Sequence, residues 1–397
     1  MLSFFASSNN SNSRQHSKIK ILERARFENM NYGKLTQDIF ERTVHKTIQN
    51  NSILYKNHFS GTGLGADCAI LPLNNDKKDA LLVTGQALAY GNDQYSAVRA
   101  MIAALNHVAV MGGVSADRTN SAEFIFMVPE KLREIKVRRM IEQAAIKAQE
   151  MGVLIASVQT QVLPMVNETV VTCNVCGARV SDSENDNISI NNSHKTDTKS
   201  KDCGIIGRNG NMSDNVCDVV MTKWIGLEGT SLIARANGEK LKERYPEDLV
   251  ETAQGFDKYL SVLEEAATAE KSGICAMQVV REGGIFGALW ELAEHNDVGL
   301  VIDLKSIPVR QETIEVCEYF DINPYELTGG GSLLITAPNG ARIVEKLAHQ
   351  GIPSAVIGYT TFGNDRIIRQ DGECRYLEPA RNDEIFKVFD KNRQDIF

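Results

Sequence analysis

A polar stretch between residues 181 and 215 most limits how this chain of 397 residues can fold. Ser, Asn, Asp, Lys and Thr dominate the stretch, and apolar residues are almost absent apart from Ile188, Ile190, Ile205 and Ile206. Such a segment cannot bury enough apolar surface to fold by itself, so we expect a disordered insertion. The chain is long enough for a domain on each side of it.

Before the insertion, the hydrophobic pattern alternates between strand and helix periods. Residues 95–111 are apolar nearly all round apart from Asn106 and His107, which is typical of a buried helix. The expected elements are a helix over 35–48, strands over 68–71 and 80–84, a loop over 85–91, the buried helix over 95–111, a strand over 124–128, a helix over 130–151, and strands over 153–158 and 169–180.

After the insertion the same alternation returns, so the fold class is α/β in both halves. The expected strands cover 216–222, 275–280, 298–304, 332–337 and 355–359, and the main helices cover 285–295, 312–320 and 340–350. The predicted domains are 31–180 and 216–380. Residues 1–30 are expected to be a disordered N-terminal extension, with Met30 as a plausible alternative start, and 381–397 a C-terminal tail.

Composition narrows the function classes. With 43% hydrophobic residues, 24% charged residues and a net charge of −8, the chain has no dominant basic character, which argues against nucleic acid as its main partner. It has no apolar run of 18 residues, so no membrane partner is expected. The start lacks the features of a signal peptide, and eight cysteines without dense regular spacing suit a cytoplasmic location.

A glycine-rich turn stands before the first strand, with Gly61, Gly63 and Gly65 at alternate positions and Asp67 directly behind them. Glycine permits tight turns and leaves no side chain to block a ligand. Successive N–H groups in such a turn can bind an anion, and Asp67 could hold a cation. A bare turn leading into a strand is the alternative interpretation.

Several motifs occur together, in order, across both halves. They are Tyr32-Gly33-Lys34-Leu35, Gly65-Ala66-Asp67-Cys68-Ala69, Asn106, Met111-Gly112-Gly113, Glu282-Gly283-Gly284-Ile285-Phe286-Gly287-Ala288-Leu289, Ile307-Pro308-Val309-Arg310 and Gly330-Gly331-Ser332-Leu333-Leu334. Over residues 31–380, apart from the insertion, the chain resembles the aminoimidazole ribonucleotide (AIR) synthase, or PurM-like, superfamily. The resemblance is greatest to the branch of the carbamoyl-dehydratase hydrogenase maturation factor.

This resemblance implies a two-domain fold in which the first domain pairs with a second copy to form a β-barrel homodimer. It also implies ATP in the groove of the first domain, with magnesium held by several aspartates and phosphoryl transfer to a substrate oxygen. Carried over to this chain, the ligand-binding residues are Gly63, Gly65, Asp67, Gln86, Asn106, His107, Gln159, Thr160, Gly283 and Gly284, with Asp67 as the metal-holding acid.

Most of the family's acids are replaced here. Besides Asp67, the metal-binding acids correspond to Thr84-Gly85-Gln86, Asn106-His107 and Val158-Gln159-Thr160, so only Asp67 survives of four metal-binding positions. The family's His-Asp pair before the second-domain glycines corresponds to Gln278-Val279. Magnesium usually takes one or two protein carboxylates, so the loss weakens a two-metal site severely. The maturation factor also needs a cysteine at its extreme C-terminus, whereas the last cysteine here is Cys374.

Three smaller features each have two interpretations. Cys173, Cys176, Cys203 and Cys217 could bind zinc, although strand cysteines fit the spacing better. His107 could be a metal ligand or base, or a hydrogen-bonding pocket residue. The glycines at 329–331 could approach a phosphate or simply lead into the next strand.

Two hypotheses follow for the function. The first is an ATP-dependent enzyme, or a diverged one, that activates a substrate oxygen and binds a nucleotide or a phosphorylated small molecule. The second is a non-catalytic ligand-binding or scaffold protein on the same fold, partnered with proteins of metal-centre assembly.

Overall fold

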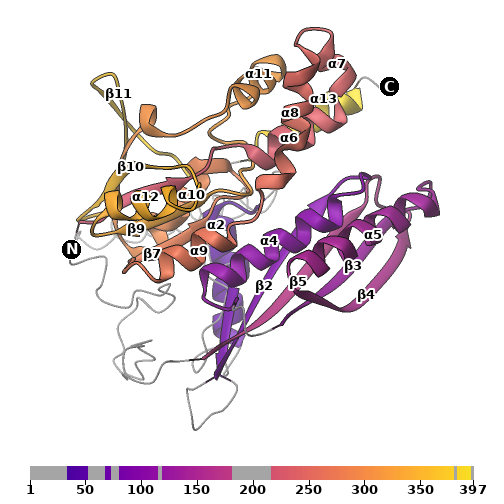
Figure 1. Cartoon of the computed structure of the whole chain (residues 1–397), viewed down its shortest axis with the longest axis horizontal. Coiled ribbons are helices and arrows are strands. Elements are labelled where there is room, and N and C mark those ends of the chain that lie inside the picture. The colour runs from indigo at the N-terminus through magenta and orange to yellow at the C-terminus, as the bar shows by residue number, and fades with distance from the viewer. Residues whose placement is uncertain are drawn as a thin grey trace, which may run out of the picture.

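The computed structural model describes residues 34–51, 68–72, 80–114, 119–180, 216–379 and 382–394. Two sheets form the centres of two domains that pack side by side (Figure 1). The predicted insertion at 181–215, the extension at 1–30 and the glycine turn at 61–67 lie outside the described residues.

The first sheet has five strands in the order β1-β2-β5-β3-β4. Its strands are β1 (Cys68–Pro72), β2 (Ala80–Tyr90), β3 (Asn120–Pro129), β4 (Val153–Leu163) and β5 (Val170–Val180). All neighbours are antiparallel except β3 and β4, which are parallel and are connected by α5 (Glu134–Glu150). Because the side chains of a strand alternate between faces, each strand sends one apolar set toward the helices and leaves the other on an open face.

The packing of helix α4 (Ser96–Val110) explains why its sequence is apolar on all sides. Every residue of α4 is buried. One side packs on β2 and β5, and another contacts α9 (Leu263–Glu270) and β7 (Ala276–Val279) of the second domain. The predicted buried helix is therefore confirmed, and it lies between the two domains (Figure 1).

The second sheet has seven strands in the order β12-β11-β8-β10-β6-β9-β7. Besides β7, they are β6 (Asp218–Thr222), β8 (Gly299–Asp303), β9 (Leu333–Ala337), β10 (Ser354–Thr361), β11 (Arg366–Gln370) and β12 (Glu373–Tyr376). The helices that surround it are α6 (Leu227–Ala236), α7 (Gly238–Lys242), α8 (Glu247–Gln254), α10 (Gly284–Asn296), α11 (Gln311–Phe320), α12 (Gly340–Ala348) and α13 (Ile385–Gln394). The two-domain α/β class predicted from the sequence is confirmed.

One predicted boundary is wrong. Residues 85–91 were expected to form a loop, but β2 continues to Tyr90. Each residue of this extension is paired with β5, up to the Tyr90 and Val170 pair, so the ladder supplies the hydrogen bonds that hold it extended. The small strands β11 and β12 and the helix α13 were not predicted at all.

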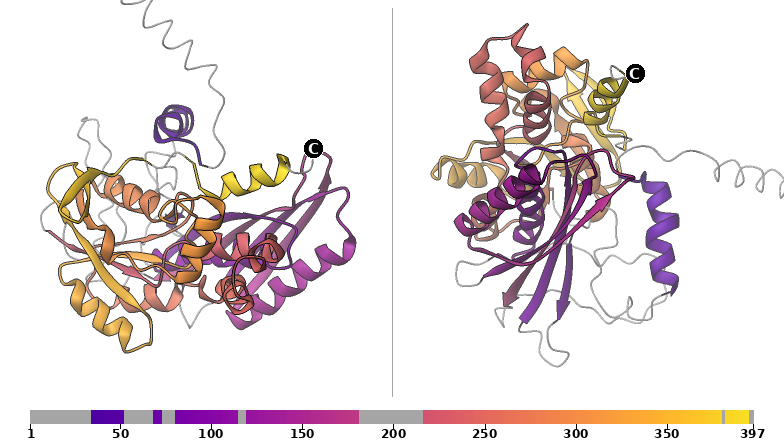
Figure 2. Two further views of the ribbon diagram at one scale, coloured as in Figure 1. Left: turned by 90° about the horizontal axis from the view of Figure 1, so that it is seen from above. Right: turned by 90° about the vertical axis from the view of Figure 1, so that its right-hand side faces the viewer.

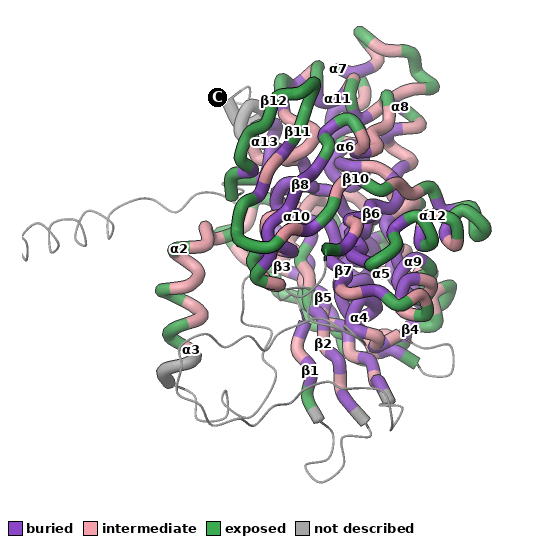
Figure 3. Tube along the Cα trace, turned by 90° about the vertical axis from the view of Figure 1, so that its left-hand side faces the viewer, coloured by how far each residue is buried: buried purple, intermediate pink, exposed green. Residues whose placement is uncertain are grey.

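The N-terminal helical segment stands beside the two domains. It consists of α2 (Gln37–Phe40), a π-helical turn (Glu41–His45) and α3 (Lys46–Asn51). Figures 2 and 3 show it set apart from the body, and α2 and the π-helical turn contain no buried residue. Its start is attached to the second domain, because the Trp290 indole N–H donates to the Gln37 side chain at 3.1 Å.

Candidate functional site

The turn before α10 is the part of the predicted site that the structure describes best. It follows β7, and both Gly283 and Gly284 have left-handed backbone angles, with φ of 79° and 63°. A Cβ atom on Gly284 would lie 2.4 Å from the carbonyl oxygen of Tyr325. Only glycine fits such a position, so the turn is tight and directs N–H groups away from the helix.

The first N–H group of this turn, that of Gly283, has a carboxylate of the protein as its partner. The Asp383 carboxylate, from the segment just before α13, accepts hydrogen bonds from the N–H groups of Gly283 at 2.8 Å, Ile385 at 3.0 Å and Thr328 at 3.2 Å. Asp383 is only 4% exposed, and burial raises the pKa of its carboxyl group to about 7 against these hydrogen bonds. A carboxylate of this chain thus lies where a helix N-terminus would receive an anionic ligand.

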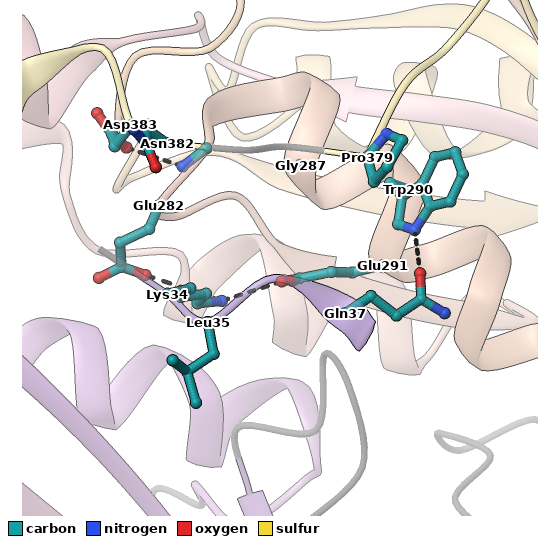
Figure 4. Close-up of a pocket in the computed structure, with 11 residues that line it drawn as sticks. Lys34, Leu35, Gln37, Glu282, Gly287, Trp290, Glu291, Pro379, Asn382 and Asp383 are labelled. Carbon is teal, nitrogen blue, oxygen red and sulfur yellow. Dashed lines mark hydrogen bonds and ion pairs between the residues drawn. The ribbon is translucent and has the colours of Figure 1, made fainter. Parts of the chain in front are cut away.

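A small pocket opens beside the turn (Figure 4). Lys34 forms an ion pair with Glu291 at 3.1 Å and lies 3.9 Å from Glu282. Counting Asp383, the lining contains three carboxylic acids and one lysine, so its net charge is negative. The cavity volume is about 50 Å³, which is room for a few water molecules and not for a nucleotide.

Buried charges connect this turn to the first domain. The Arg281 guanidinium lies 3.4 Å from the Glu228 carboxylate and 3.0 Å from Glu282, and it also donates to the Leu88 carbonyl on β2 at 3.4 Å. Burial raises the pKa of Glu228, which the nearby Arg281 opposes. Tyr90, at the end of β2, has a pKa raised well above its usual value by burial and by the nearby Asp383.

Strand register places two of the predicted residues on the open face of the first sheet. Gln86 lies in a row of polar residues that crosses four strands: Gln86, Asn174, Glu123 and Ser157. The next row contains Leu88, Thr172, Ile125 and Gln159. Gln86 and Gln159 are both exposed, so they are available to a ligand or partner on this face.

Asn106 and His107 lie on the covered side of the same sheet. The Asn106 amide donates to the Leu260 carbonyl at 2.7 Å and accepts from the Val262 N–H at 3.0 Å. His107 Nδ1 lies 3.2 Å from the carbonyl oxygen of Gln86. Asn106 therefore joins the two domains, and the His107 ring is 95% covered.

The remaining predicted residues are separated from these. Thr160 pairs with the buried Phe126, so its side chain points to the face opposite Gln159. Gly63, Gly65 and Asp67 lie outside the described residues. The structure thus brings Gln86 and Gln159 onto one face and Gly283 and Gly284 into one turn, with Asn106 and His107 beneath the sheet.

Packing against α4 explains why residue 85, next to Gln86, is a glycine. A Cβ atom on Gly85 would lie 2.7 Å from the Ala104 carbonyl oxygen and 3.0 Å from the His107 Cβ atom. Residue 85 faces α4, and its neighbour Gln86 faces outward. A carboxylate at 85 would require the strand and the helix to separate.

Sequence reasoning missed the residues that surround the α10 turn. Lys34 lies in one of the sequence motifs, but the motif indicates no role for it, and nothing in the sequence pairs Glu228 with Arg281. No sequence pattern connects Asp383 with Gly283, which is 100 residues away. A single acidic residue near the C-terminal end of a domain forms no sequence pattern that indicates burial or a partner.

Packing bears on two of the smaller features, the glycines at 329–331 and the cysteines. A Cβ atom on Gly330 would lie 2.2 Å from the Glu228 carboxylate, and one on Gly331 would lie 2.5 Å from the Tyr259 carbonyl oxygen, which favours a packing role for these glycines. Cys173 and Cys176 are three residues apart on β5, so their side chains lie on opposite faces of the sheet, which argues against a shared zinc ion. Cys203 lies outside the described residues.

The described residues do not fit magnesium and a triphosphate at the α10 turn. The Gly283 N–H binds Asp383, the Gly284 N–H binds the Arg281 carbonyl, and the adjoining pocket is acidic and small. Within the described ranges, no group of three or more His, Cys, Asp or Glu side chains is arranged to hold a metal. The same residues include no helix long and apolar enough to cross a membrane.

Residues 217–369, which carry the second sheet and the α10 turn, match the family described as AIR synthase related protein, C-terminal domain. This part of the chain therefore belongs to that family, and the chain as a whole is similar to the AIR synthase-like superfamily. The resemblance inferred from the motifs is confirmed, including its placement with the HypE branch.

Two curated relatives of the superfamily illustrate that branch. Carbamoyl dehydratase HypE of Rhizobium leguminosarum bv. viciae is 27% identical over 166 residues, covering 38% of this chain and 45% of that protein. A putative hydrogenase expression/formation protein of Methanocaldococcus jannaschii is 24% identical over 199 residues, covering 43% of this chain and 58% of that protein. The match thus spans about half the length of these relatives.

Solved structures of the superfamily share the fold. E. coli HypE has a TM-score of 0.59 at 17% identity, covering 76% of this chain and 86% of that chain. HypE in complex with ATP has a TM-score of 0.57 at 17% identity, covering 89% and 99%. AaThiL complexed with AMPPCP and TMP has a TM-score of 0.60 at 14% identity, covering 89% of this chain and 99% of that chain. A HypE–HypF complex has a TM-score of 0.57 at 18% identity, covering 79% of this chain and 93% of that chain. Identities this low establish a common fold and leave the chemistry open.

Proposed function

We propose that this protein is a ligand-binding assembly protein of the HypE branch that does not transfer phosphate. The observation that carries the proposal is the Asp383 carboxylate bound to the N–H groups of Gly283 and Thr328. The replacement of the family's acids by Gln86, His107 and Gln159 supports it. An enzyme of this family needs positive groups and metal ions around the transferred phosphoryl group.

The ligand is a nucleotide or another phosphorylated small molecule, bound without a catalytic magnesium site. The polar row of Gln86, Asn174, Glu123 and Ser157 supplies hydrogen-bonding groups on an accessible face. Proteins of metal-centre assembly are the proposed partners, because the relatives include hydrogenase maturation proteins and one solved HypE is complexed with HypF. The cytoplasm is the proposed location.

An ATP-dependent enzyme is the second candidate, and the complex of HypE with ATP favours it. Asp67 is the acid that such an enzyme would use to hold magnesium. Because only Asp67 remains of the four acids, this candidate predicts that one substitution removes all magnesium dependence.

A combined binding and hydrolysis assay distinguishes the candidates. Wild type and Asp67→Asn are compared for phosphate release from ATP, with and without magnesium, and for the nucleotide-induced shift in melting temperature. Our proposal expects no magnesium-dependent phosphate release and similar melting shifts in both proteins. Magnesium-dependent hydrolysis that Asp67→Asn abolishes would establish the enzyme instead.

Asp383→Ala adds a direct test of the occupied turn. Removing the carboxylate frees the N–H groups of Gly283 and Thr328, so inorganic phosphate should raise the melting temperature of this variant more than that of wild type. Asp371→Ala, an exposed acid in the turn between β11 and β12, serves as the matched control and should behave like wild type. An equal response of all three proteins to phosphate would contradict an anion site at the turn.

A further inference from the structure

Two cysteines far apart in the sequence meet at one end of the second sheet. Cys217 immediately precedes β6, and Cys275 immediately precedes β7. Both strands pair with β9, one on each side of it. The two Sγ atoms lie 3.1 Å apart. Neither thiol takes part in the site described above.

Backbone hydrogen bonds fix both cysteines in place. The Cys217 N–H donates to the Thr360 hydroxyl oxygen at 2.8 Å, and its carbonyl accepts from the Thr360 N–H at 2.8 Å. The Cys275 N–H donates to the Thr336 carbonyl at 2.7 Å. The thiols are therefore held opposite each other by the sheet itself, and not by the chance position of a loop.

The two thiols differ in their access to solvent. Cys217 is fully buried, whereas Cys275 is partly exposed. An oxidant from solution therefore reaches Cys275 first, and the buried Cys217 thiol lies next to it. Redox-responsive cysteines commonly combine an accessible thiol with a neighbouring thiol that resolves the first oxidation product.

We propose that Cys217 and Cys275 form a reversible redox pair that a peroxide converts into a disulfide. The Cys275 sulfur attacks one peroxide oxygen, the O–O bond breaks, and Cys275 becomes a sulfenic acid while the other oxygen leaves as water. The Cys217 sulfur then attacks the Cys275 sulfur, the S–O bond breaks, and the oxygen leaves as a second water that carries the Cys217 proton. The two thiols lose two electrons in total, and hydrogen peroxide is reduced to two waters.

The geometry makes the second step short. A disulfide has an S–S distance of about 2.05 Å, so the sulfur atoms need to approach by about 1 Å from their present separation, and because β9 lies between β6 and β7 the starts of these two strands must also move together. The product covalently joins the starts of β6 and β7 across β9. This cross-link closes a long loop of the unfolded chain, so oxidation should raise the melting temperature.

The test treats the full-length protein with hydrogen peroxide, blocks the remaining thiols with an alkylating reagent, and maps the peptides by mass spectrometry. We expect a linked peptide that joins Cys217 to Cys275, a loss of two alkylated thiols per chain, and full reversal by dithiothreitol. Cys217→Ser and Cys275→Ser should each abolish the linked peptide and the oxidation-dependent rise in melting temperature. Cys374→Ser, at an exposed cysteine of β12, should leave both unchanged.

Three results would overturn the proposal. One is accumulation of sulfinic acid at Cys275 in wild type without a linked peptide. Another is a disulfide from Cys275 to a different cysteine, which would show that the contact with Cys217 does not direct the chemistry. The third is an oxidation-dependent rise in melting temperature that persists unchanged in Cys275→Ser. Since Cys275 is partly exposed, its serine variant tests the proposal even if Cys217→Ser fails to fold.

Discussion

The surroundings of the Asp383 carboxyl group shift its pKa in opposite directions. Three backbone N–H groups stabilise its charged form, while burial and the nearby Glu282 favour the neutral form. Burial prevails, so the pKa rises from 3.8 to about 7. The charge at the α10 turn therefore changes close to neutral pH.

We predict that Asp383 gives the protein a measurable pH dependence. The folded state binds a proton more tightly than the unfolded state, so the stabilisation by the neutral carboxyl is fully present below about pH 4. It is lost as the pH rises through about 7. Relative to Asp383→Asn, wild type should lose a few kcal/mol of unfolding free energy across this window, at about 1.4 kcal/mol per pKa unit.

Urea unfolding of both proteins between pH 4 and pH 8 measures this difference. Asn keeps the shape of the side chain but does not titrate, so other ionisable groups cancel in the comparison. A difference that stays constant, or that grows in favour of wild type with rising pH, would contradict the assigned environment of Asp383.

Asn106 shows the limit of reading a residue from its neighbours in sequence. Its presence on a buried helix indicated a polar role, and a ligand was a reasonable candidate. Both hydrogen-bonding ends of its amide instead bind the backbone at Leu260 and Val262, some 155 residues away. A buried amide must find partners, but the sequence does not say whether those partners are ligand or protein.

At the scale of elements, the contact between β2 and α4 determines where the open face of the first sheet lies. Gly85 allows the strand to approach the helix closely, with the Ala104 carbonyl and the Val108 side chain beside it. The prediction of a loop over 85–91 failed because Gly85 and Gln86 are weak strand formers. Pairing with β5 along the whole of β2 overrides that local preference.

We predict that Gly85→Ala destabilises the protein by about 1–3 kcal/mol. The added Cβ atom would lie 2.7 Å from a backbone oxygen that cannot move without shifting α4. Gly255→Ala is the matched control, because its Cβ atom meets nothing within 4 Å and its φ of −82° suits alanine. Chemical unfolding should give a lower unfolding free energy for Gly85→Ala than for the control. If the two variants are equally stable, β2 and α4 can accommodate a Cβ atom at residue 85 and the prediction is wrong.

At the scale of the whole molecule, the open face of the first sheet is the surface that a second copy would cover. Leu88 is 48% exposed and Ile125 is 43% exposed, and strand register places them in one row. Family resemblance implies a dimer through this sheet, and exposed apolar side chains support that proposal. Such a dimer would also surround Gln86 and Gln159.

We therefore predict a homodimer that Ile125→Asp dissociates, because a carboxylate in the centre of the interface would be buried without a partner. Light scattering coupled to size-exclusion chromatography should give twice the chain mass for wild type and the chain mass for the variant. Ile146→Asp, at a 52% exposed position on α5, should remain dimeric. A monomeric wild type, or an unchanged Ile125→Asp dimer, would argue for another use of this face.

The sequence by itself determined the α/β alternation, the buried character of α4 and the glycine turn at Gly283 and Gly284. Those features depend on the spacing of apolar residues and on backbone freedom within a few residues, and both can be read directly from a chain. Only the tertiary structure decided that Asp383 binds the turn, that Asn106 joins the domains and that Gln86 and Gln159 share a face. These contacts connect segments about 70 to 155 residues apart, and they arise from how whole elements pack and from strand register.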